Sequence, residues 1–414
     1  MLIKNVRLID PKTQTDKISD VYIENGKIAP TSTDNVVVDG TNLIMAPGLV
    51  DVHVHFRDPG QTAKEDLTTG TNAAINGGYS DVVCMANTIP VMDDIDLYIK
   101  TKKRMDELQI HVHQACAISK GFHGKELTPM EELQKLGVRM FTDDGLPLRD
   151  ESFVLKAMIE AKRLNTVLSF HEEDPNYIGF AGINDGVISQ QLGFKGASRE
   201  AEIIMVKRDI ALAKESGACI NIQHISSKEA VELVRQAKAE GVNIHAEACP
   251  HHFTLTENDV LTYGSLAKMN PPLRLETDRQ AIIDGLKDGT IDLIATDHAP
   301  HTNEEKSREL TKTPSGIIGL ETALALANQE LVLKNHLTYL QLFAKMATNP
   351  ANLIGIDKSL EIGQPADFIL FDPNYTWTVD HFASKSENSP FKGWRLTGKV
   401  IANYINGIKK GPTY

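Results

Sequence analysis

The middle of the chain alternates between short apolar runs and segments with helical periodicity. The number of runs is the strongest constraint on the fold, because about eight strand–helix repeats over some 300 residues match a (β/α)8 barrel of the TIM type. The alternative is a doubly wound open sheet. No Gly-x-Gly-x-x-Gly follows the first run, which favours the barrel. The runs lie at 48–56, 79–87, 110–118, 138–143, 166–172, 218–226, 242–249 and 290–297.

Several of the intervening segments carry signals for the start or end of a helix. Residues 62–78 end on Gly-Gly, and residues 150–165 begin with an aspartate that can cap a helix. Residues 198–217 and 226–241 each open on serine and close on glycine. A last helical segment, 320–335, follows the final apolar run. These signals predict helices between the strands.

Both ends of the chain have a different pattern, typical of β structure. Short stretches with β-branched alternation are separated by Asn-Gly and Asp-Gly turns. We therefore expect one small β-sandwich domain built from residues 1–46 and 358–414. The barrel is predicted to span residues 47–357.

Charge and composition exclude some classes of partner. The net charge is −12 and no Lys/Arg cluster offsets it, so no nucleic-acid partner is expected. No apolar run approaches the ~20 residues of a membrane helix, so no membrane association is expected. The four cysteines show no C-x-x-C spacing, and the start lacks the layout of a signal peptide. These features predict a cytoplasmic protein with reduced thiols.

Polar side chains recur where the apolar runs end, which is where barrel enzymes carry their catalytic groups. Residues two apart on a strand share a face, so His53 and His55 can bind one cation. Imidazoles and carboxylates both bind zinc. Four histidines and two aspartates exceed the roughly three protein ligands of one catalytic metal, which favours a pair of metals. The residues at these ends are His53, His55, Arg57, Asn87, Asp143, Asp144, His171, His224, Asp297, His298 and His301.

Other histidines are interpreted differently, because a single buried histidine is usually a hydrogen-bonded core residue. His111 and His113 repeat the His-x-His spacing at the start of the third run, the opposite end of the barrel, and are expected to be structural. His245 lies in the middle of a run and is expected to be structural too. His251 and His252 fall at the catalytic end, where we expect them to support the ligands rather than to bind metal.

The motifs DVHVHFRDPG, FTDDG, QHIS, MNPPLR and ATDHAPH, in this order, resemble the amidohydrolase superfamily and within it the class I dihydroorotases. The resemblance covers essentially the whole chain. It implies two Zn2+ per subunit. His53, His55 and Asp297 would bind one zinc, and His171 and His224 the other.

The resemblance also bears on the residue that bridges the metals. Many members of the superfamily use a carboxylated lysine, but GVRMFTDDG contains none. This chain is similar instead to the subgroup with an aspartate bridge, and spacing to His171 favours Asp144 over Asp143, either of which could be only a turn residue.

The resemblance implies a ring substrate that carries a carboxylate, and the remaining motif residues are expected to bind it. The planar fork of Arg57 suits a carboxylate, with Asn87 and His301 as further contacts implied by the resemblance. Asn270 and the backbone at Ser315 and Gly316 resemble contacts to the amide groups of the ring. The complete set of implied substrate residues is His55, Arg57, Asn87, Asn270, His301, Ser315 and Gly316.

The function implied is the reversible cyclisation of N-carbamoyl-L-aspartate to (S)-dihydroorotate in de novo pyrimidine biosynthesis. A hydroxide activated by two zinc ions would attack the ring, and Asp297 would carry the proton. The resemblance also implies a homodimer and a possible complex with aspartate transcarbamoylase. Two alternatives stay open: a hydantoinase, dihydropyrimidinase or allantoinase, whose substrates lack the ring carboxylate, and an inactive scaffold homologue.

Overall fold

Eight short parallel strands form the centre of the computed structural model, which describes residues 1–411. They pair in two series, β6-β7-β8 and β9-β10-β11-β12-β13. Single parallel bridges, Cys116 with Phe141 and Val54 with His298, join the two series at both ends. The ring is therefore closed, and the (β/α)8 prediction is confirmed. The strands are β6 (Leu49–Val54), β7 (Tyr79–Cys84), β8 (His111–Gln114), β9 (Met140–Phe141), β10 (Val167–Phe170), β11 (Cys219–Ile222), β12 (Ile244–Ala248) and β13 (Leu293–Ile294).

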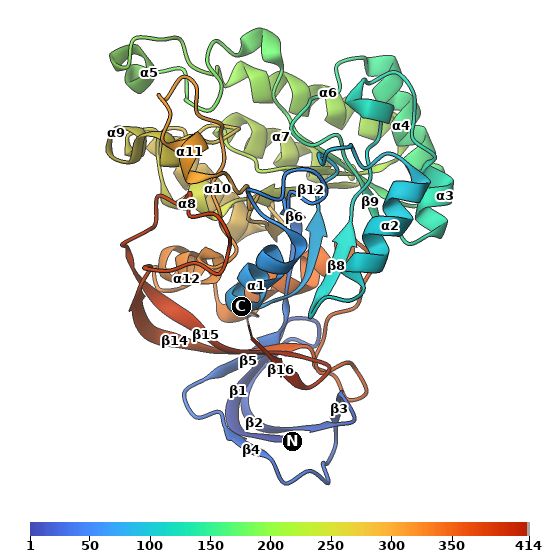
Figure 1. The fold of residues 1–414 in the computed structure, drawn as a ribbon, viewed down its shortest axis with the longest axis vertical. Coiled ribbons are helices and arrows are strands. Elements are labelled where there is room, and N and C mark those ends of the chain that lie inside the picture. The colour runs from blue at the N-terminus through green and yellow to red at the C-terminus, as the bar shows by residue number, and fades with distance from the viewer. Residues whose placement is uncertain (412–414) are drawn as a thin grey trace.

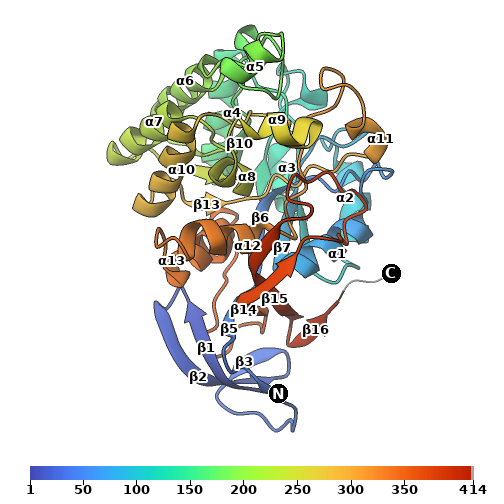
Figure 2. The same ribbon diagram turned by 90° about the vertical axis from the view of Figure 1, so that its left-hand side faces the viewer.

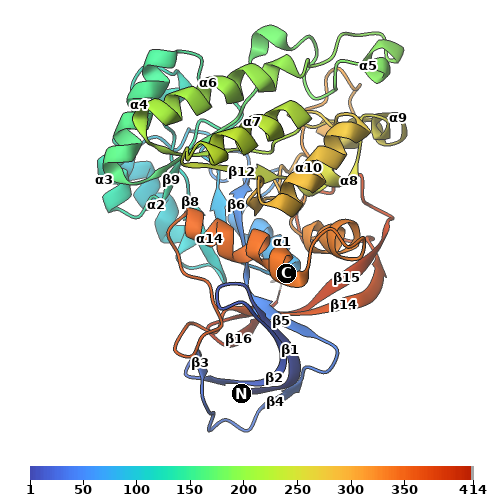
Figure 3. The ribbon, with the colours of Figure 1, turned by 180° about the vertical axis from the view of Figure 1, so that it is seen from behind.

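Helices cover the outside of this ring. Four long ones, α4, α6, α7 and α10, pack side by side in chain order around one side, as Figure 3 shows. The α-helices are α1 (Leu67–Gly77), α2 (Ile95–Met105), α3 (Met130–Lys135), α4 (Glu151–Leu164), α5 (Val187–Gln191), α6 (Glu200–Ser216), α7 (Lys228–Ala239), α8 (Pro250–Thr254), α9 (Asp259–Tyr263), α10 (Glu276–Asp288), α11 (Asn303–Lys306), α12 (Ala323–Ala327), α13 (Tyr339–Phe343) and α14 (Asn349–Leu353).

The predicted helix signals act largely as expected. Asp150 caps α4 by accepting hydrogen bonds from the backbone N–H groups of residues 152 and 153. Ser227 caps α7 in the same way. Gly78 and Gly217 end α1 and α6 in the left-handed conformation, which glycine adopts without steric cost. At the start of α6, Arg199 takes the cap position, one residue after the serine that opens the predicted segment.

Strands from both chain ends form one eight-stranded sheet below the barrel (Figures 1 and 2). Its order is β16-β15-β14-β5-β1-β2-β3, with β4 beside β1. β14 pairs antiparallel with β5, which joins the C-terminal strands to the N-terminal ones. The domain limits at residues 46 and 358 stay a prediction. The strands are β1 (Leu2–Asp10), β2 (Thr15–Glu24), β3 (Lys27–Ala29), β4 (Val37–Asp39), β5 (Ile44–Pro47), β14 (Phe368–Thr378), β15 (Arg395–Ile405) and β16 (Ile408–Lys410).

A charge cluster, in which Lys358, Asp81 and Asp367 are buried, links the lower end of the barrel to this sheet. Lys358 Nζ lies 2.6 Å from Asp81 Oδ2 and 3.0 Å from Asp367 Oδ2. His113 Nε2 lies 3.0 Å from Asp81 Oδ1, and His111 Nε2 lies 3.3 Å from Asp367 Oδ2. Both histidines are thus placed at the end of the barrel opposite the predicted site, in structural contacts. Over residues 1–411, no helix has the length and apolar character to cross a membrane.

Candidate active site

The six predicted metal ligands converge at the C-terminal mouth of the barrel. His53 lies on β6 and His55 directly after it, while the others follow β9, β10, β11 and β13. Each of the six side chains is at most 8% exposed, so the cluster is shielded from bulk water. The remaining members are Asp144, His171, His224 and Asp297.

His53 and His55 face the two aspartates together. His53 Nε2 lies 3.4 Å from Asp144 Oδ1 and 3.4 Å from Asp297 Oδ1. His55 Nε2 lies 3.0 Å from Asp297 Oδ1 and 3.4 Å from Asp144 Oδ2. The two ring nitrogens and two carboxylates therefore meet around one point.

His171 and His224 complete the cluster and contact each other. His171 Nδ1 and His224 Nε2 are 3.0 Å apart. They lie 3.9 and 4.0 Å, respectively, from Asp144 Oδ1. The Asp144 carboxylate thus lies within 4.0 Å of a ring nitrogen of each of the four histidines.

Asp143 and Asp144 are adjacent but face different surroundings. Asp143 Oδ1 accepts hydrogen bonds from the backbone N–H groups of Ile118 at 2.7 Å and Ser119 at 3.0 Å. Burial raises the pKa of Asp143 to about 6. Burial also opposes the charge of Asp144, but the neighbouring imidazoles hold its pKa well below the usual range. The geometry therefore places Asp143 in a structural contact and Asp144 in the cluster.

The donor set fits divalent cations. His53 Nε2 is buried and has no hydrogen-bond partner in the described part of the chain, although two carboxylates lie near it. Two groups of three ligand atoms each gather within 4.8 Å: His53, His55 and Asp297, and His53, Asp144 and His224. A cation bound by imidazole and carboxylate would satisfy the orphaned nitrogen.

Three of the site residues have positive φ: Arg57 at 58°, His224 at 31° and Asp297 at 46°. Side chains other than glycine rarely adopt this region, which costs on the order of 1–3 kcal/mol per residue. Each follows the end of a barrel strand, where the turn of the backbone sets the direction of the side chain. Strain of this kind gathers where surrounding structure holds a functional geometry.

Sequence reasoning missed two carboxylates that hold the ligands. Glu247 on β12 is fully buried, and its Oε1 lies 2.6 Å from His53 Nδ1. Glu173 Oε2 lies 3.1 Å from His171 Nε2. Carboxylates in such contacts fix the orientation of a ligand imidazole. The signal for Glu247 was present, since it is a carboxylate near the C-terminal end of a barrel strand, where the other candidate residues also lie.

A cavity of about 130 Å³ opens beside the cluster. Asn270 and Ser315 both line it and are joined directly, with Ser315 Oγ donating to Asn270 Oδ1 at 2.9 Å. Asn87 Oδ1 lies 2.9 Å from His55 Nδ1, and its amide donates to Asp144, so this residue positions two ligands. The lining residues are His55, Asn87, Asp144, Gly145, His171, His224, Met269, Asn270, Asp297, Ala299, Ser315 and Gly316.

Arg57 and His301 are not among the residues that line this cavity, but they contact residues beside it. Arg57 Nε donates to the carbonyl of Pro300 at 3.3 Å, which ties the guanidinium to the segment that carries His301. The His301 ring packs against Gly316, where an added Cβ would lie 2.8 Å from the ring. Burial and the charge of Arg57 lower the pKa of His301 to about 3, so its ring is neutral near pH 7.

Asn388, from the segment between β14 and β15, was also missed. It accepts a hydrogen bond from the backbone N–H of His301 at 3.0 Å. Its amide donates to the carbonyls of Ala299 at 2.9 Å and Gly316 at 3.1 Å. One side chain from the C-terminal part of the chain thus fixes two loops of the site.

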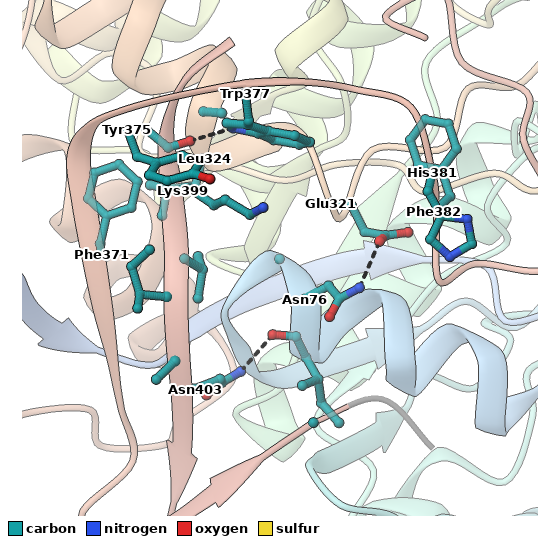
Figure 4. A pocket seen from close by; sticks show the side chains of 18 of the residues that line it. Asn76, Glu321, Leu324, Phe371, Tyr375, Trp377, His381, Phe382, Lys399 and Asn403 are labelled. Carbon is teal, nitrogen blue, oxygen red and sulfur yellow. Dashed lines mark hydrogen bonds between the residues drawn. The ribbon is translucent and has the colours of Figure 1, made fainter. Parts of the chain in front are cut away.

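A larger cavity, of about 750 Å³, lies elsewhere, between helices α1 and α12 and strands β14 and β15 (Figure 4). Asn76 donates to Glu321 at its edge, and the Lys399 ammonium lies 5.3 Å from the ring centres of Tyr375 and Trp377. None of the predicted site residues lines it. The chemistry of the six ligands, not cavity size, therefore locates the candidate site.

Comparisons with known proteins agree with this geometry. The family model described as "Dihydro-orotase-like" matches residues 42–230. The chain is 53% identical to a dihydroorotase of Clostridioides difficile (strain 630) and 47% identical to one of Lactococcus lactis subsp. lactis, covering 98% of each chain in both cases. Among solved structures, the L-hydantoinase of Arthrobacter aurescens superposes with a TM-score of 0.88 at 24% identity, covering 99% of this chain and 95% of that one. At that identity the likeness supports the barrel fold alone.

Proposed function

Since this chain belongs to the dihydroorotase family, we propose that it catalyses the reversible cyclisation of N-carbamoyl-L-aspartate to (S)-dihydroorotate, a step of de novo pyrimidine biosynthesis. One observation carries the proposal: six ligand-type side chains from separate strands meet at one mouth of the barrel, beside a small cavity. The chain is a cyclic amidohydrolase by family, and the cavity limits its substrate to a small molecule.

The proposal includes two Zn2+ bound by the six residues. His53, His55 and Asp297 would hold one ion, and His171 and His224 the other, with Asp144 shared. Bound there, the ions would lower the pKa of a water molecule towards neutrality and polarise a carbonyl oxygen. The unpartnered Nε2 of His53 supports this assignment.

Asp297 would hold and move the proton of the reaction. Its carboxylate lines the cavity and lies 3.0 Å from His55 Nε2. In the hydrolytic direction it accepts a proton from the attacking water and delivers it to the departing ring nitrogen. In the biosynthetic direction the same group removes the proton from the attacking nitrogen.

Arg57 and His301 would bind the ring carboxylate. Among the described residues, Arg57 hydrogen-bonds only through Nε, which leaves its two terminal nitrogens for a bidentate contact. His301 Nδ1 lies 3.5 Å from both the Lys64 ammonium and Glu305 Oε2, so contacts with the protein hold this edge of the ring. Its Nε2 lies against Gly316 and would contact the substrate. Asn270, Ser315 and Gly316 would contact the amide groups of the ring.

Turnover assays separate this function from its rivals. We expect hydrolysis of dihydroorotate, loss of activity when a chelator removes metal, and recovery on addition of Zn2+. Faster hydrolysis of hydantoin or allantoin than of dihydroorotate would overturn the substrate assignment. An inactive scaffold would show neither turnover nor bound metal after purification without chelator.

The assembly and location of the protein are further proposals. We propose a cytoplasmic homodimer that can associate with aspartate transcarbamoylase. All four cysteines are free thiols, which agrees with a reducing compartment. Light scattering on the protein alone, and then with the transcarbamoylase added, tests the two associations, and a monomer in both measurements would contradict them.

A further inference from the structure

A separate cluster of ligand-type side chains lies where β12 runs into α8. Cys249, His251 and His252 each offer one ligand atom, and the three atoms lie within 4.8 Å of one another. The residues are 0%, 1% and 3% exposed, respectively. The cluster shares no residue with the two groups that contain His53. It is therefore a distinct set of donors, buried behind the candidate active site.

Two nitrogens of this cluster have no partner. His252 Nε2 lies 2.9 Å from the carbonyl oxygen of Pro271, so Nε2 carries the ring proton and Nδ1 keeps its lone pair. Within residues 1–411, neither His252 Nδ1 nor His251 Nε2 has a hydrogen-bond partner, and both are buried. The thiol of Cys249 has one proton and can serve only one of them. Since buried polar atoms are as a rule satisfied, these two nitrogens are available as metal ligands.

We propose that Cys249, His251 and His252 bind a third cation, a Zn2+ ion with one thiolate and two imidazole ligands. Sulfur and imidazole together select a borderline cation such as zinc, whereas Mg2+ and Ca2+ require oxygen donors. Tetrahedral bonds of about 2.0–2.3 Å place ligand atoms about 3.3–3.8 Å apart, so side-chain rotations that draw the three atoms together by about 1 Å would bring them to bonding distance. The fourth position would belong to water.

Such an ion would stiffen one wall of the candidate active site. His252 already contacts Pro271, the residue after Asn270. Asn270 lines the cavity and accepts a hydrogen bond from Ser315. A cation on His252 would therefore fix the loop that presents Asn270, through the imidazole and the Pro271 carbonyl. The site positions a substrate contact and takes no part in proton transfer.

X-ray absorption at the zinc edge tests the proposal directly. The protein is loaded with Zn2+, desalted, and measured as the full chain. None of the six ligands of the candidate active site carries sulfur, so sulfur at about 2.3 Å from zinc reports a cysteine ligand. We expect that sulfur signal in the unsubstituted protein. Its absence there overturns the proposal, whether or not the protein hydrolyses dihydroorotate, so this result is independent of the proposed function.

Matched cysteine variants assign the sulfur. Cys249→Ser should bind one Zn2+ fewer per chain and lose the sulfur signal. Cys116→Ser should keep the full zinc content and the sulfur signal. Cys116 is equally buried, but it belongs to none of the ligand clusters found among the described residues. Retention of sulfur and of full zinc content in Cys249→Ser would overturn the proposal. If that variant does not fold, the absorption spectrum of the unsubstituted protein loaded with Co2+ provides the test. A thiolate ligand gives a charge-transfer band that imidazole and carboxylate ligands do not, so the absence of this band would overturn the proposal.

Discussion

Replacing Glu247 with glutamine tests whether a residue outside the ligand set controls metal binding. Glu247 Oε1 lies 2.6 Å from His53 Nδ1 and accepts from the backbone N–H of His224 at 3.3 Å. Its Oε2 accepts from the Asn221 amide at 3.2 Å. One buried carboxylate thus holds two predicted ligands in place. Glutamine keeps the shape of the side chain and removes its charge.

The expected loss follows from the two contacts to ligand residues. A hydrogen bond to a charged acceptor contributes about 1 kcal/mol more than one to a neutral acceptor. Two such bonds give about 2 kcal/mol, which corresponds to about a 30-fold weaker affinity for metal. This lies within the roughly 10–100-fold range typical of residues that orient metal ligands. Turnover at limiting metal should fall by the same factor.

Competition with a chelator of known affinity measures the metal affinity of the Glu247→Gln variant, and hydrolysis of dihydroorotate at fixed metal measures turnover. Glu202→Gln is the control, because Glu202 is also buried but accepts from the backbone N–H groups of Ser226 and Ser227. That change should lower stability and leave metal affinity intact. A Glu247→Gln protein that melts normally and binds metal within about threefold of the original would refute the reasoning.

Three further predictions concern single side chains. Asp297→Asn should keep the fold and lower kcat by at least ~100-fold in the dihydroorotate assay, and near-normal turnover would remove Asp297 from its role. Asp144→Asn should lower the metal content of the purified protein. Asp143→Asn should keep the metal content and lower the free energy of unfolding in denaturant by about 1–3 kcal/mol. The opposite pair of results would mean that Asp143, not Asp144, binds metal. Burial opposes the charge of His245, but Asp292 raises its pKa to about 9, and the side chain is 33% exposed. The charged ring contributes about 1–2 kcal/mol to the free energy of unfolding after solvent screening. This contribution is complete below about pH 6.5 and is lost as pH rises through about 9. Denaturant unfolding should therefore show that His245→Gln lowers stability at about pH 6 and leaves it unchanged at about pH 10.

The sequence predicts most of the barrel because its signals are local. The strands β6 and β7 can be recognised from the apolar residues that they themselves contain. Asp150 caps α4 through backbone groups only two and three positions away. The six ligands are also predictable, since the fold brings the ends of all strands to one mouth. The choice of Asp144 over Asp143 depended on spacing and is supported by which carboxylate faces the histidines.

The residues that escaped prediction act across long stretches of the chain. Glu247 is 194 residues from His53, and nothing near it in the sequence indicates that partner. Asn388 holds the backbone of His301, 87 residues away, from a segment without regular structure. Such contacts are set by tertiary packing. Hydrophobic periodicity and helix-capping signals are local, so they do not predict contacts between distant residues.

The pairing of β5 with β14 has a consequence for synthesis on the ribosome. Pro47 pairs with Phe368, so β5 emerges roughly 320 residues before the strand that covers its edge. At about 5–20 residues per second, the nascent chain exposes that edge for on the order of tens of seconds. An uncovered strand edge is a template for association with other chains. A ribosome that stalls before residue 368 therefore leaves a product that is prone to aggregate, even if its barrel has already formed.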